Sequence, residues 1–341
     1  MVFGKESCPL DLVGIGKTIA RKCQGLPLAI IVIAGLLSRI RRTSDSWKSI
    51  ADNVSSTVNT DSEQCIGILA LSYNHLPHHL KACFLYMGAF PEDGEIEVKK
   101  LVRLWVAEGF LDKQLPRLAE RVAAVSSDRE AIAEIFLEDL IGRNLVFVAK
   151  RSFSGRNKTC RIHDLLRELC LREAQRENFM CLIKRDIHCL PAGINRKRRI
   201  SFHSEFCGDL RSVPAIPHVR SFLMFSLGLG FPADIFLLQL GFKLLRVLDI
   251  IFLRSEHFPT QILKLVHLRY LALTATYELP ASISKLCNLQ TLIIHGPWIL
   301  SENGESPTIF FEYWNMPWLR HLGFTVTCSL CIPPIPEINY P

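Results

Sequence analysis

The sequence predicts a mainly α-helical first part followed by an α/β solenoid. In the first part, apolar side chains recur at every third or fourth position, which is the spacing of one face of a helix. In the second part, a set of leucines returns at a fixed offset, which is typical of a stacked structural repeat. The chain has 341 residues, of which 49% are hydrophobic and 21% charged. It can therefore bury a core and has room for two or three domains.

The net charge and the cysteines narrow the class of protein further. A net charge of +7 is mild for this length, so it permits an acidic partner without singling out nucleic acid. The twelve cysteines are scattered, and no secretory signal opens the chain, so we expect reduced thiols in a cytoplasmic protein. Cys328 and Cys331 form the one CxxC pair, and without a second pair at zinc spacing we expect no structural metal.

Gly16-Lys17-Thr18 matches the closing triplet of an ATP-binding P-loop. That loop also needs a glycine five positions earlier, and Asp11 stands there, where a carboxylate would repel a phosphate. The apolar residues around the triplet fall at helical spacing. We therefore expect an ordinary helix with Lys17 in solvent.

A second helix is predicted directly after this one. Gly25 can end the first helix, and Pro27 suits the first turn of the next, where its missing N–H costs nothing. Residues 28–37 are apolar or small on every side, so we expect this helix to be buried all round. The run is also too short for a membrane span, which needs about 20 residues.

The next segment combines helices with a strand hairpin. Apolar residues from position 98 make a helical stripe that Gly109 can end, and a further helix is expected over 128–141. A strand is predicted from Leu145, followed by a hairpin turn around Ser154-Gly155. This order predicts a small helical bundle that merges into a winged-helix unit.

His163 lies beside another predicted helix start. Ile162, Leu165, Leu166 and Leu169 form the apolar stripe of that helix, and Asp164 is the expected N-cap. An anion at this N-terminus would be held by the helix dipole and by the imidazole together. Taken alone, however, such a histidine is more often an ordinary surface or core residue.

The second half of the chain carries an internal repeat of leucine-rich type. The positions that recur 21 residues later are Pro259, Ile262, Leu265, Leu268 and Leu271. Further copies align from Leu245, Leu319 and, more weakly, Val219. Asp249 resembles the acid of a Walker B strand, but it lies in register with the repeats, so we assign it to the repeat core.

Four of these segments together resemble the plant disease-resistance receptors of the NB-ARC plus leucine-rich-repeat family, of the late blight resistance type. The matching segments are Gly25-Leu26-Pro27-Leu28 (GLPL), Cys83 to Asp93 (CFLY and FPED), Leu104 to Phe110 (LW.AEGF) and Ile162-His163-Asp164, where the family has Met-His-Asp. The resemblance covers nearly the whole chain, and the segments stand in the family's order.

The resemblance implies a domain order. It assigns 1–80 to the helical subdomain of NB-ARC that carries GLPL, and 81–175 to the winged-helix subdomain. It makes 176–197 a linker and 198–341 an incomplete set of leucine-rich repeats. On this reading we expect the chain to be a piece that is truncated at both ends.

The resemblance also implies a nucleotide site. In that family an upstream domain holds ADP at rest, or ATP, and the helical and winged-helix subdomains close over it. Pro27, with Leu28 beside it, would lie near the adenine, and His163 would reach the β-phosphate. Because no P-loop or Walker B pair precedes residue 25, we expect weak or no ADP binding by this chain alone.

Three functions follow as alternatives, and no catalytic arrangement suggests an enzyme. The first is the switch and sensor part of an immune receptor, with intramolecular NB-ARC contacts and a pathogen or host protein bound by the repeats. The second is a repeat scaffold that binds protein without nucleotide. Side chains expected at exposed strand positions for such a partner are Arg269, Tyr270, Gln290, Thr291 and His295.

The third alternative is a winged-helix regulator that binds DNA. The basic cluster Arg196–Arg199 resembles a nuclear signal. Against this reading, Trp105 and its apolar neighbours occupy the presumed DNA-reading helix and leave few basic side chains for it. We therefore favour the first two alternatives.

Overall fold

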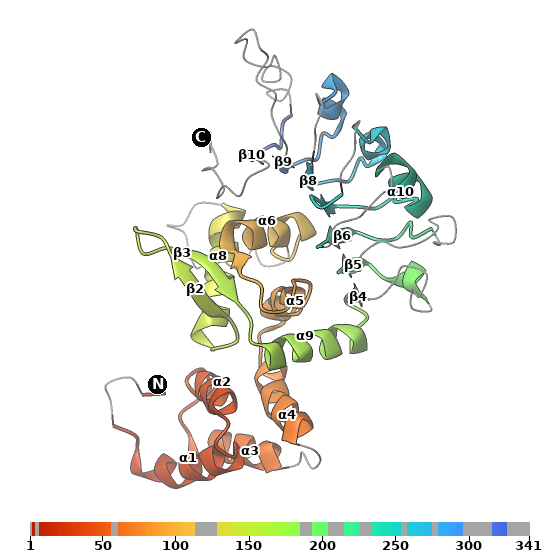
Figure 1. The fold of residues 1–341 in the computed structure, drawn as a ribbon. Helices are drawn as coiled ribbons and strands as arrows, with labels where there is room; N and C mark the ends of the chain where they lie inside the picture. Colours follow the sequence, from red (N-terminus) through yellow and green to blue (C-terminus); the bar gives the residue numbers. More distant parts are fainter. Residues whose placement is uncertain are drawn as a thin grey trace. The chain divides into compact units, whose positions relative to one another are not determined.

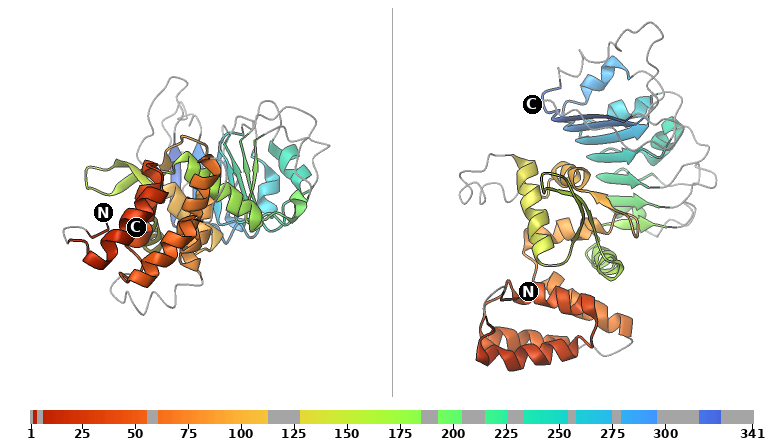
Figure 2. Two further views of the ribbon diagram at one scale, coloured as in Figure 1. Left: turned by 90° about the horizontal axis from the view of Figure 1, so that it is seen from below. Right: turned by 60° about the vertical axis from the view of Figure 1, so that its left-hand side comes forward.

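The computed structural model of the chain describes residues 2–3, 7–55, 61–112, 128–184, 193–203, 215–225, 233–253, 258–274, 279–295 and 316–325. The chain divides into two compact units (Figures 1 and 2). Unit 1 comprises Met1–Val106 and Phe110–Ala174. Unit 2 comprises Ala107–Gly109 and Gln175–Pro341.

Unit 1 begins with a group of helices. They are α1 (Leu10–Lys22), α2 (Pro27–Leu37), α3 (Ser44–Ser55) and α4 (Asp61–Asn74). Helix α1 packs against α3, and α2 packs against α4. The core between them contains Leu12 and Ile19 of α1, Ile33 of α2, and Trp47 and Ile50 of α3. These residues recur at helical spacing, so each helix buries one apolar face.

The P-loop lookalike lies inside α1. Gly16, Lys17 and Thr18 are within the helix, and the Thr18 hydroxyl donates to the Gly14 carbonyl at 3.1 Å. Backbone N–H groups in a helix interior are already hydrogen-bonded, so they cannot wrap a phosphate. The prediction of an ordinary helix with Lys17 exposed is confirmed.

Helix α2 begins at Pro27 as the sequence predicts, but it is not buried all round. Ile33 and most of its apolar neighbours are buried, whereas Ile30 is 38% exposed. The reason is that Ile30 faces an open cavity of about 490 Å³ instead of another helix. The composition of α2 could not show which side lacked a neighbour.

The rest of unit 1 has the helices and the hairpin that the sequence predicts. The elements are α5 (His78–Met87), β1 (Ile96–Glu97), α6 (Val98–Glu108), α8 (Arg129–Gly142), β2 (Phe147–Arg151), β3 (Asn157–Arg161) and α9 (Asp164–Arg176). The three strands form an antiparallel sheet in the order β1-β3-β2. Gly155 takes a φ of +79° in the turn between β2 and β3, and Gly109 takes +80° just after α6.

Unit 2 is a parallel sheet of seven strands in the order β10-β9-β8-β7-β6-β5-β4 (Figure 2). The strands are β4 (Cys181–Ile183), β5 (Arg199–Phe202), β6 (Ser221–Met224), β7 (Val247–Ile250), β8 (Tyr270–Thr274), β9 (Thr291–His295) and β10 (His321–Thr325). Short helical segments stand between strands: η2 (Ile194–Arg196), α10 (Ala233–Leu240), η4 (Thr260–Lys264) and η5 (Ala281–Lys285). Leu248, Leu271 and Leu292 occupy one register position in adjacent strands, which confirms the predicted repeat.

Two details of unit 2 differ from the sequence-based expectations. Within 176–197, which was expected as a linker, Cys181–Ile183 add strand β4 at the sheet edge because Cys181 and Ile183 are buried in the repeat core. The expectation that Tyr270 and Thr291 are exposed was wrong, since their exposed fractions are 0% and 2%. These two residues stand at one register position on adjacent strands, so each shields the other.

The cysteines within the described ranges are free, and Cys328 and Cys331 lie outside them. Over the same ranges, no group of three or more His, Cys, Asp or Glu side chains could hold a metal ion. Nor does any helix in those ranges have the length and apolar character to cross a membrane.

Candidate functional site

A tight turn presents Pro27 at the start of α2. Gln24 and Gly25 take φ values of 52° and 74°, and the Leu26 N–H donates to the Cys23 carbonyl at 3.0 Å. Pro27 is the first helical residue, and no side chain caps this helix start. Its ring is exposed, while Leu28 is half-buried. The positive end of α2 therefore carries an exposed apolar ring.

His163 is the capping residue of α9. Its main-chain carbonyl accepts from the Arg167 N–H at 2.8 Å, and its Nδ1 accepts from the Leu165 N–H at 3.3 Å. The sequence predicted Asp164 as the cap, but Asp164 is already the first helical residue. That prediction was wrong because the approaching backbone, which the sequence does not display, decides which side chain can reach back to the free N–H groups.

This cap determines which proton the imidazole carries. Because Nδ1 accepts a hydrogen bond, a neutral His163 ring has its proton on Nε2. The side chain is exposed, so Nε2 is available to donate to a ligand. An imidazole that donates from a helix N-terminus suits an anion such as a phosphate.

Helix α9 is fixed in place by contacts that the sequence analysis missed. Arg167 is 4% exposed, and its Nε donates to the Phe90 carbonyl at 2.8 Å. One turn later, the Cys170 thiol donates to the Phe84 carbonyl at 3.2 Å. A Cβ on Gly88 would lie 3.1 Å from the Cys170 Cβ, so the backbones run close together. The CFLY and FPED segments thus hold the helix that carries His163.

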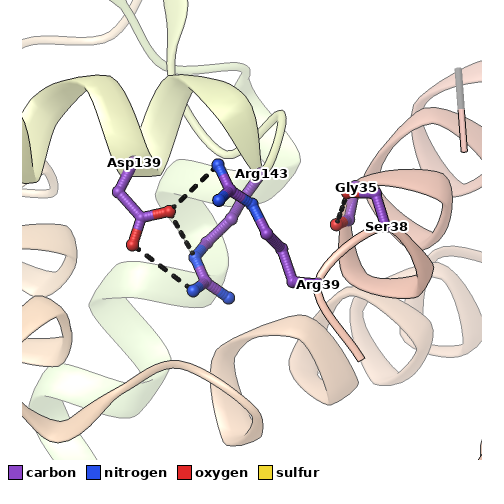
Figure 3. Close-up of polar contacts among 5 residues, drawn as sticks. All are labelled: Gly35, Ser38, Arg39, Asp139 and Arg143. Carbon is purple, nitrogen blue, oxygen red and sulfur yellow. Dashed lines mark hydrogen bonds and ion pairs between the residues drawn. The ribbon is translucent and has the colours of Figure 1, made fainter. Parts of the chain in front are cut away.

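The other end of α2 is joined to α8 by a charged cluster (Figure 3). Asp139 accepts from Arg143 through both oxygens, at 3.2 and 3.3 Å. The same carboxylate lies 3.2 Å from the Nη2 of Arg39, which follows α2. Asp139 therefore bridges two guanidinium groups from different parts of unit 1.

Backbone packing beside this cluster is equally close. The Asn144 side-chain amide donates to the Ile31 carbonyl of α2 at 3.0 Å. A Cβ on Gly35 would lie 2.3 Å from the Arg143 carbonyl oxygen, a distance that no side chain tolerates. Only glycine lets α2 approach the end of α8 this closely.

Pro27 and Leu28 are thus at one helix start and His163 at another. One cavity of about 450 Å³ is lined by α1 and α3, including Thr18, Lys22 and Lys48. The cavity of about 490 Å³ is lined by α1, α2 and Trp47. Neither of these two cavities includes Pro27, Leu28 or His163. A joint role of the three residues stays a prediction.

Both units of the chain are similar to parts of known proteins. Residues 89–170 match the family model described as the disease resistance protein winged helix domain, and residues 218–306 match a leucine-rich repeat region. Late blight resistance protein R1-A of Solanum demissum is 36% identical over 348 residues, covering 94% of this chain. The chain belongs to the family of late blight resistance proteins.

Other late blight resistance proteins agree with this assignment. The putative late blight resistance protein homolog R1B-16 of Solanum demissum is 36% identical over 335 residues, again with 94% of this chain covered. The putative homolog R1B-12 of the same species is 38% identical over 340 residues, with 94% covered. The chain spans about a quarter of the length of these relatives, 24% to 25%.

Some of the contacts that the sequence analysis missed had a signal in the sequence, and others did not. Asp139 and Arg143 are four residues apart at the end of the helix predicted over 128–141, which is the spacing of a helical ion pair. Arg167 lies off the apolar stripe of its helix, and nothing local shows that it turns inward. The approach of Gly35 to Arg143 joins positions more than a hundred residues apart in sequence, which periodicity does not reveal.

Proposed function

We propose that this chain is the lid and sensor part of a plant intracellular immune receptor, located in the cytoplasm. In this proposal α2 and α9 belong to the helical and winged-helix subdomains of an NB-ARC region. They close over ADP, whose main phosphate contacts come from another part of the intact protein. The parallel repeat sheet continues the solenoid pattern and binds a protein partner.

The imidazole of His163, which caps α9, is the observation that carries this proposal. With Nδ1 engaged by the Leu165 N–H, the exposed Nε2 is a donor at the positive end of α9. We assign it to the β-phosphate of ADP. Pro27 and Leu28 supply apolar contacts at the start of α2, which suits the flat face of adenine.

An intact relative that carries this chain in place of its own matching segment provides the test. Bound ADP is measured by chromatography after denaturing the purified receptor. His163→Ala removes both the cap and the Nε2 donor. His163→Asn keeps a good N-cap but lacks a donor at the position of Nε2. We expect both variants to lose most of their ADP.

His267→Ala is the matched control, because His267 is also exposed but lies in the repeats. We expect its ADP content to equal that of the parent. ADP retained by both His163 variants would remove the phosphate role. ADP lost by His163→Ala but kept by His163→Asn would show that the residue acts only as a helix cap.

The second candidate is a repeat scaffold without nucleotide. It is favoured by the placement of Pro27, Leu28 and His163, which neither of the two cavities brings together. Equilibrium dialysis with ADP is therefore run on the 341-residue chain and on the intact receptor with its His163 variants, and occupancy that depends on His163 separates the two functions. We expect weak or undetectable binding by this chain alone, and full occupancy only in the intact receptor.

The DNA-binding alternative gains no support from the basic cluster. The Lys197 ammonium donates to the Asn178 side chain at 2.7 Å, and the Arg199 Nε donates to Glu108 at 3.0 Å. Trp105 on α6 is fully buried. These side chains are engaged within the protein, so we do not propose a DNA-reading function.

A further inference from the structure

The turn between β2 and β3 presents an aromatic side chain to solvent. The ring of Phe153 is fully exposed, and it makes no ring contact with another described residue. In Figure 1 this turn extends beyond the helices of unit 1, and the left view of Figure 2 shows the same. A single exposed apolar residue needs no explanation by itself, so the groups around it decide what it can do.

The backbone of this turn is held without help from the ring. The Ser152 N–H donates to the Arg156 carbonyl at 2.8 Å, and the Gly155 N–H donates to the Ser152 carbonyl at 2.9 Å. The Ser152 and Ser154 hydroxyls lie 2.8 Å apart. Gly155 supplies the φ of +79° that the turn requires. The formation of the hairpin therefore does not explain why a phenylalanine stands at position 153.

Basic side chains flank the turn, and acids do not balance them. No Asp or Glu occurs in β2, in β3 or in the turn between them. Glu95, from outside the hairpin, pairs with Lys150 at 3.0 Å. Arg151, Arg156 and Lys158 are exposed, and their side chains form no ion pair or hydrogen bond with the described residues. Three positive charges beside the exposed ring are therefore open to an anionic partner.

The charges and the ring stand at different levels of the hairpin. We call Arg151, Phe153, Arg156 and Lys158 the hairpin tip. Arg151 precedes the ring by two residues, which is about 7 Å along an extended strand. On the opposite strand, Arg156 and Lys158 stand on either side of Asn157, the residue that pairs with Arg151. The three basic residues therefore share one level, and the ring lies beyond it.

This order of groups matches the surface of an anionic lipid bilayer. Lipid phosphates and carboxylates lie at that surface, and apolar side chains of interfacial segments are buried about 5–10 Å into the boundary with the acyl chains. A ring about 7 Å beyond the charges reaches this depth while the charges stay among the headgroups. Long basic side chains also place their apolar stems against lipid and keep their charged ends in water.

Duplex DNA matches the hairpin tip less well. A DNA-binding winged helix places a second element against the base edges, while phosphate contacts alone only position it. The presumed DNA-reading helix, α6, instead buries Trp105. The exposed Phe153 ring would have to separate stacked bases, which costs free energy, whereas it enters the apolar layer of a bilayer without such a cost. The hairpin tip therefore favours a lipid surface.

We propose that the hairpin tip binds the surface of an anionic lipid bilayer. Phe153 inserts at the boundary with the acyl chains, and Arg151, Arg156 and Lys158 contact the phosphate and carboxylate groups of the lipids. One ring and three charges hold a protein only weakly, so the attachment is reversible. This inference goes beyond the proposed lid and sensor function, because it depends neither on the nucleotide nor on the repeats.

The test measures sedimentation of the full 341-residue chain with large unilamellar vesicles. One set of vesicles consists of phosphatidylcholine alone, and the other contains about 30% phosphatidylserine. We expect the chain to sediment with the second set and to do so less as the salt concentration increases, because charge attraction contributes. Failure to sediment with the phosphatidylserine vesicles at low salt would overturn the proposal.

Variants of the ring test its insertion. We expect Phe153→Ser to weaken vesicle binding at least about fivefold and Phe153→Trp to preserve it, since tryptophan also favours the membrane interface. Leu238→Ser is the matched control, because Leu238 on α10 is an apolar side chain that is 62% exposed. Its binding should change less than about twofold. Equal losses in Phe153→Ser and Leu238→Ser would overturn the role of the ring.

Charge-matched variants locate the basic contact. Arg151→Gln with Lys158→Gln removes two charges from the hairpin tip, and Lys264→Gln with Lys285→Gln removes two exposed charges from η4 and η5. We expect at least about tenfold weaker vesicle binding for the first pair and less than about twofold change for the second. Equal losses would indicate nonspecific attraction of a basic chain and would overturn the assignment to the hairpin tip.

Two further measurements complete the test. The hairpin variants change exposed positions, so their circular dichroism spectra should equal that of the parent chain and show that lost binding is not lost folding. A short duplex DNA that displaces the parent chain from the vesicles at equal phosphate concentration would overturn the choice of a lipid surface. None of these readouts depends on ADP, so a negative result leaves the nucleotide proposal standing.

Discussion

At the scale of single residues, Arg167 shows how a buried charge can hold a helix in place. Its guanidinium is removed from water, and this burial lowers its pKa. The Nε hydrogen bond to the Phe90 carbonyl offsets part of that cost, while Glu92, at 3.8 Å from Nη1, is itself more than half exposed. The Phe90 contact is therefore the stronger of the two.

We predict that Arg167→Ala lowers the free energy of unfolding by about 2–4 kcal/mol, because the Phe90 carbonyl loses its donor and a packed side chain is removed. Arg172→Ala, on the same helix, is the control. Arg172 is nearly half exposed and pairs with Glu168 one turn away, so its loss should cost about 0.5 kcal/mol or less. Urea unfolding followed by circular dichroism measures both, and equal effects would contradict the structural role of Arg167.

At the scale of elements, the approach of α2 to α8 depends on Gly35. Gly35→Ala would place a Cβ 2.3 Å from the Arg143 carbonyl oxygen, a backbone atom that cannot move alone. We predict a loss of about 1–3 kcal/mol or more in the free energy of unfolding, measured by urea titration. Gly14→Ala in α1 is the control, since a Cβ there meets nothing within 4 Å.

The control variant, Gly14→Ala, should be more stable than the parent protein. Alanine is a better helix former than glycine, so Gly14→Ala should raise the free energy of unfolding by about 0.5–1 kcal/mol. A Gly35→Ala protein as stable as the parent would mean that α2 and α8 can separate without cost. Such a result would remove the close packing on which the α2–α8 junction depends.

Most elements could be predicted from the sequence because periodicity and turn residues act locally. Pro27 marks the start of α2, and the recurring leucines mark the strands of unit 2. The contacts between elements could not be predicted in this way. The exposure of Ile30, the inward turn of Arg167 and the burial of Tyr270 each depend on neighbours that are distant in sequence.

The candidate site shows the same division. Sequence placed Pro27 and His163 at helix starts, and both helices begin there. It chose the wrong cap for α9, because capping depends on the path of the preceding backbone. The distance between the two helix starts is set by packing across unit 1, which no local pattern encodes.

At the scale of the whole molecule, each unit has its own buried core. The cysteine thiols of the two units differ in how far they are exposed to solvent. Cys83, Cys160 and Cys170 are fully buried in unit 1, whereas Cys287 in unit 2 is exposed. Burial raises the pKa of these three thiols, that of Cys160 to about 12. The thiolate is the reactive form of cysteine. The folded state therefore protects these thiols in two ways, by excluding the reagent and by keeping them protonated.

The raised thiol pKa values also fix the direction of a pH effect. Unfolded thiols ionise near their ordinary pKa of 9.0, while the folded thiols stay protonated. The unfolded state therefore binds fewer protons as the pH rises above 9. The contribution of these thiols to the free energy of unfolding is fully present below that pH and decreases as the pH rises toward the folded pKa values.

We predict that a pulse of iodoacetamide at pH 8.5 labels Cys287 and leaves Cys83, Cys160 and Cys170 at least about 100-fold less reactive. Peptide mass spectrometry resolves each site. With increasing urea, the three thiols should become reactive over one concentration range, because they share the core of one cooperative unit. Reaction of Cys170 before Cys83 and Cys160 would instead show that α9, with His163 at its start, opens separately from the rest of unit 1. Opening of that kind would make α9 itself the moving part of the proposed lid.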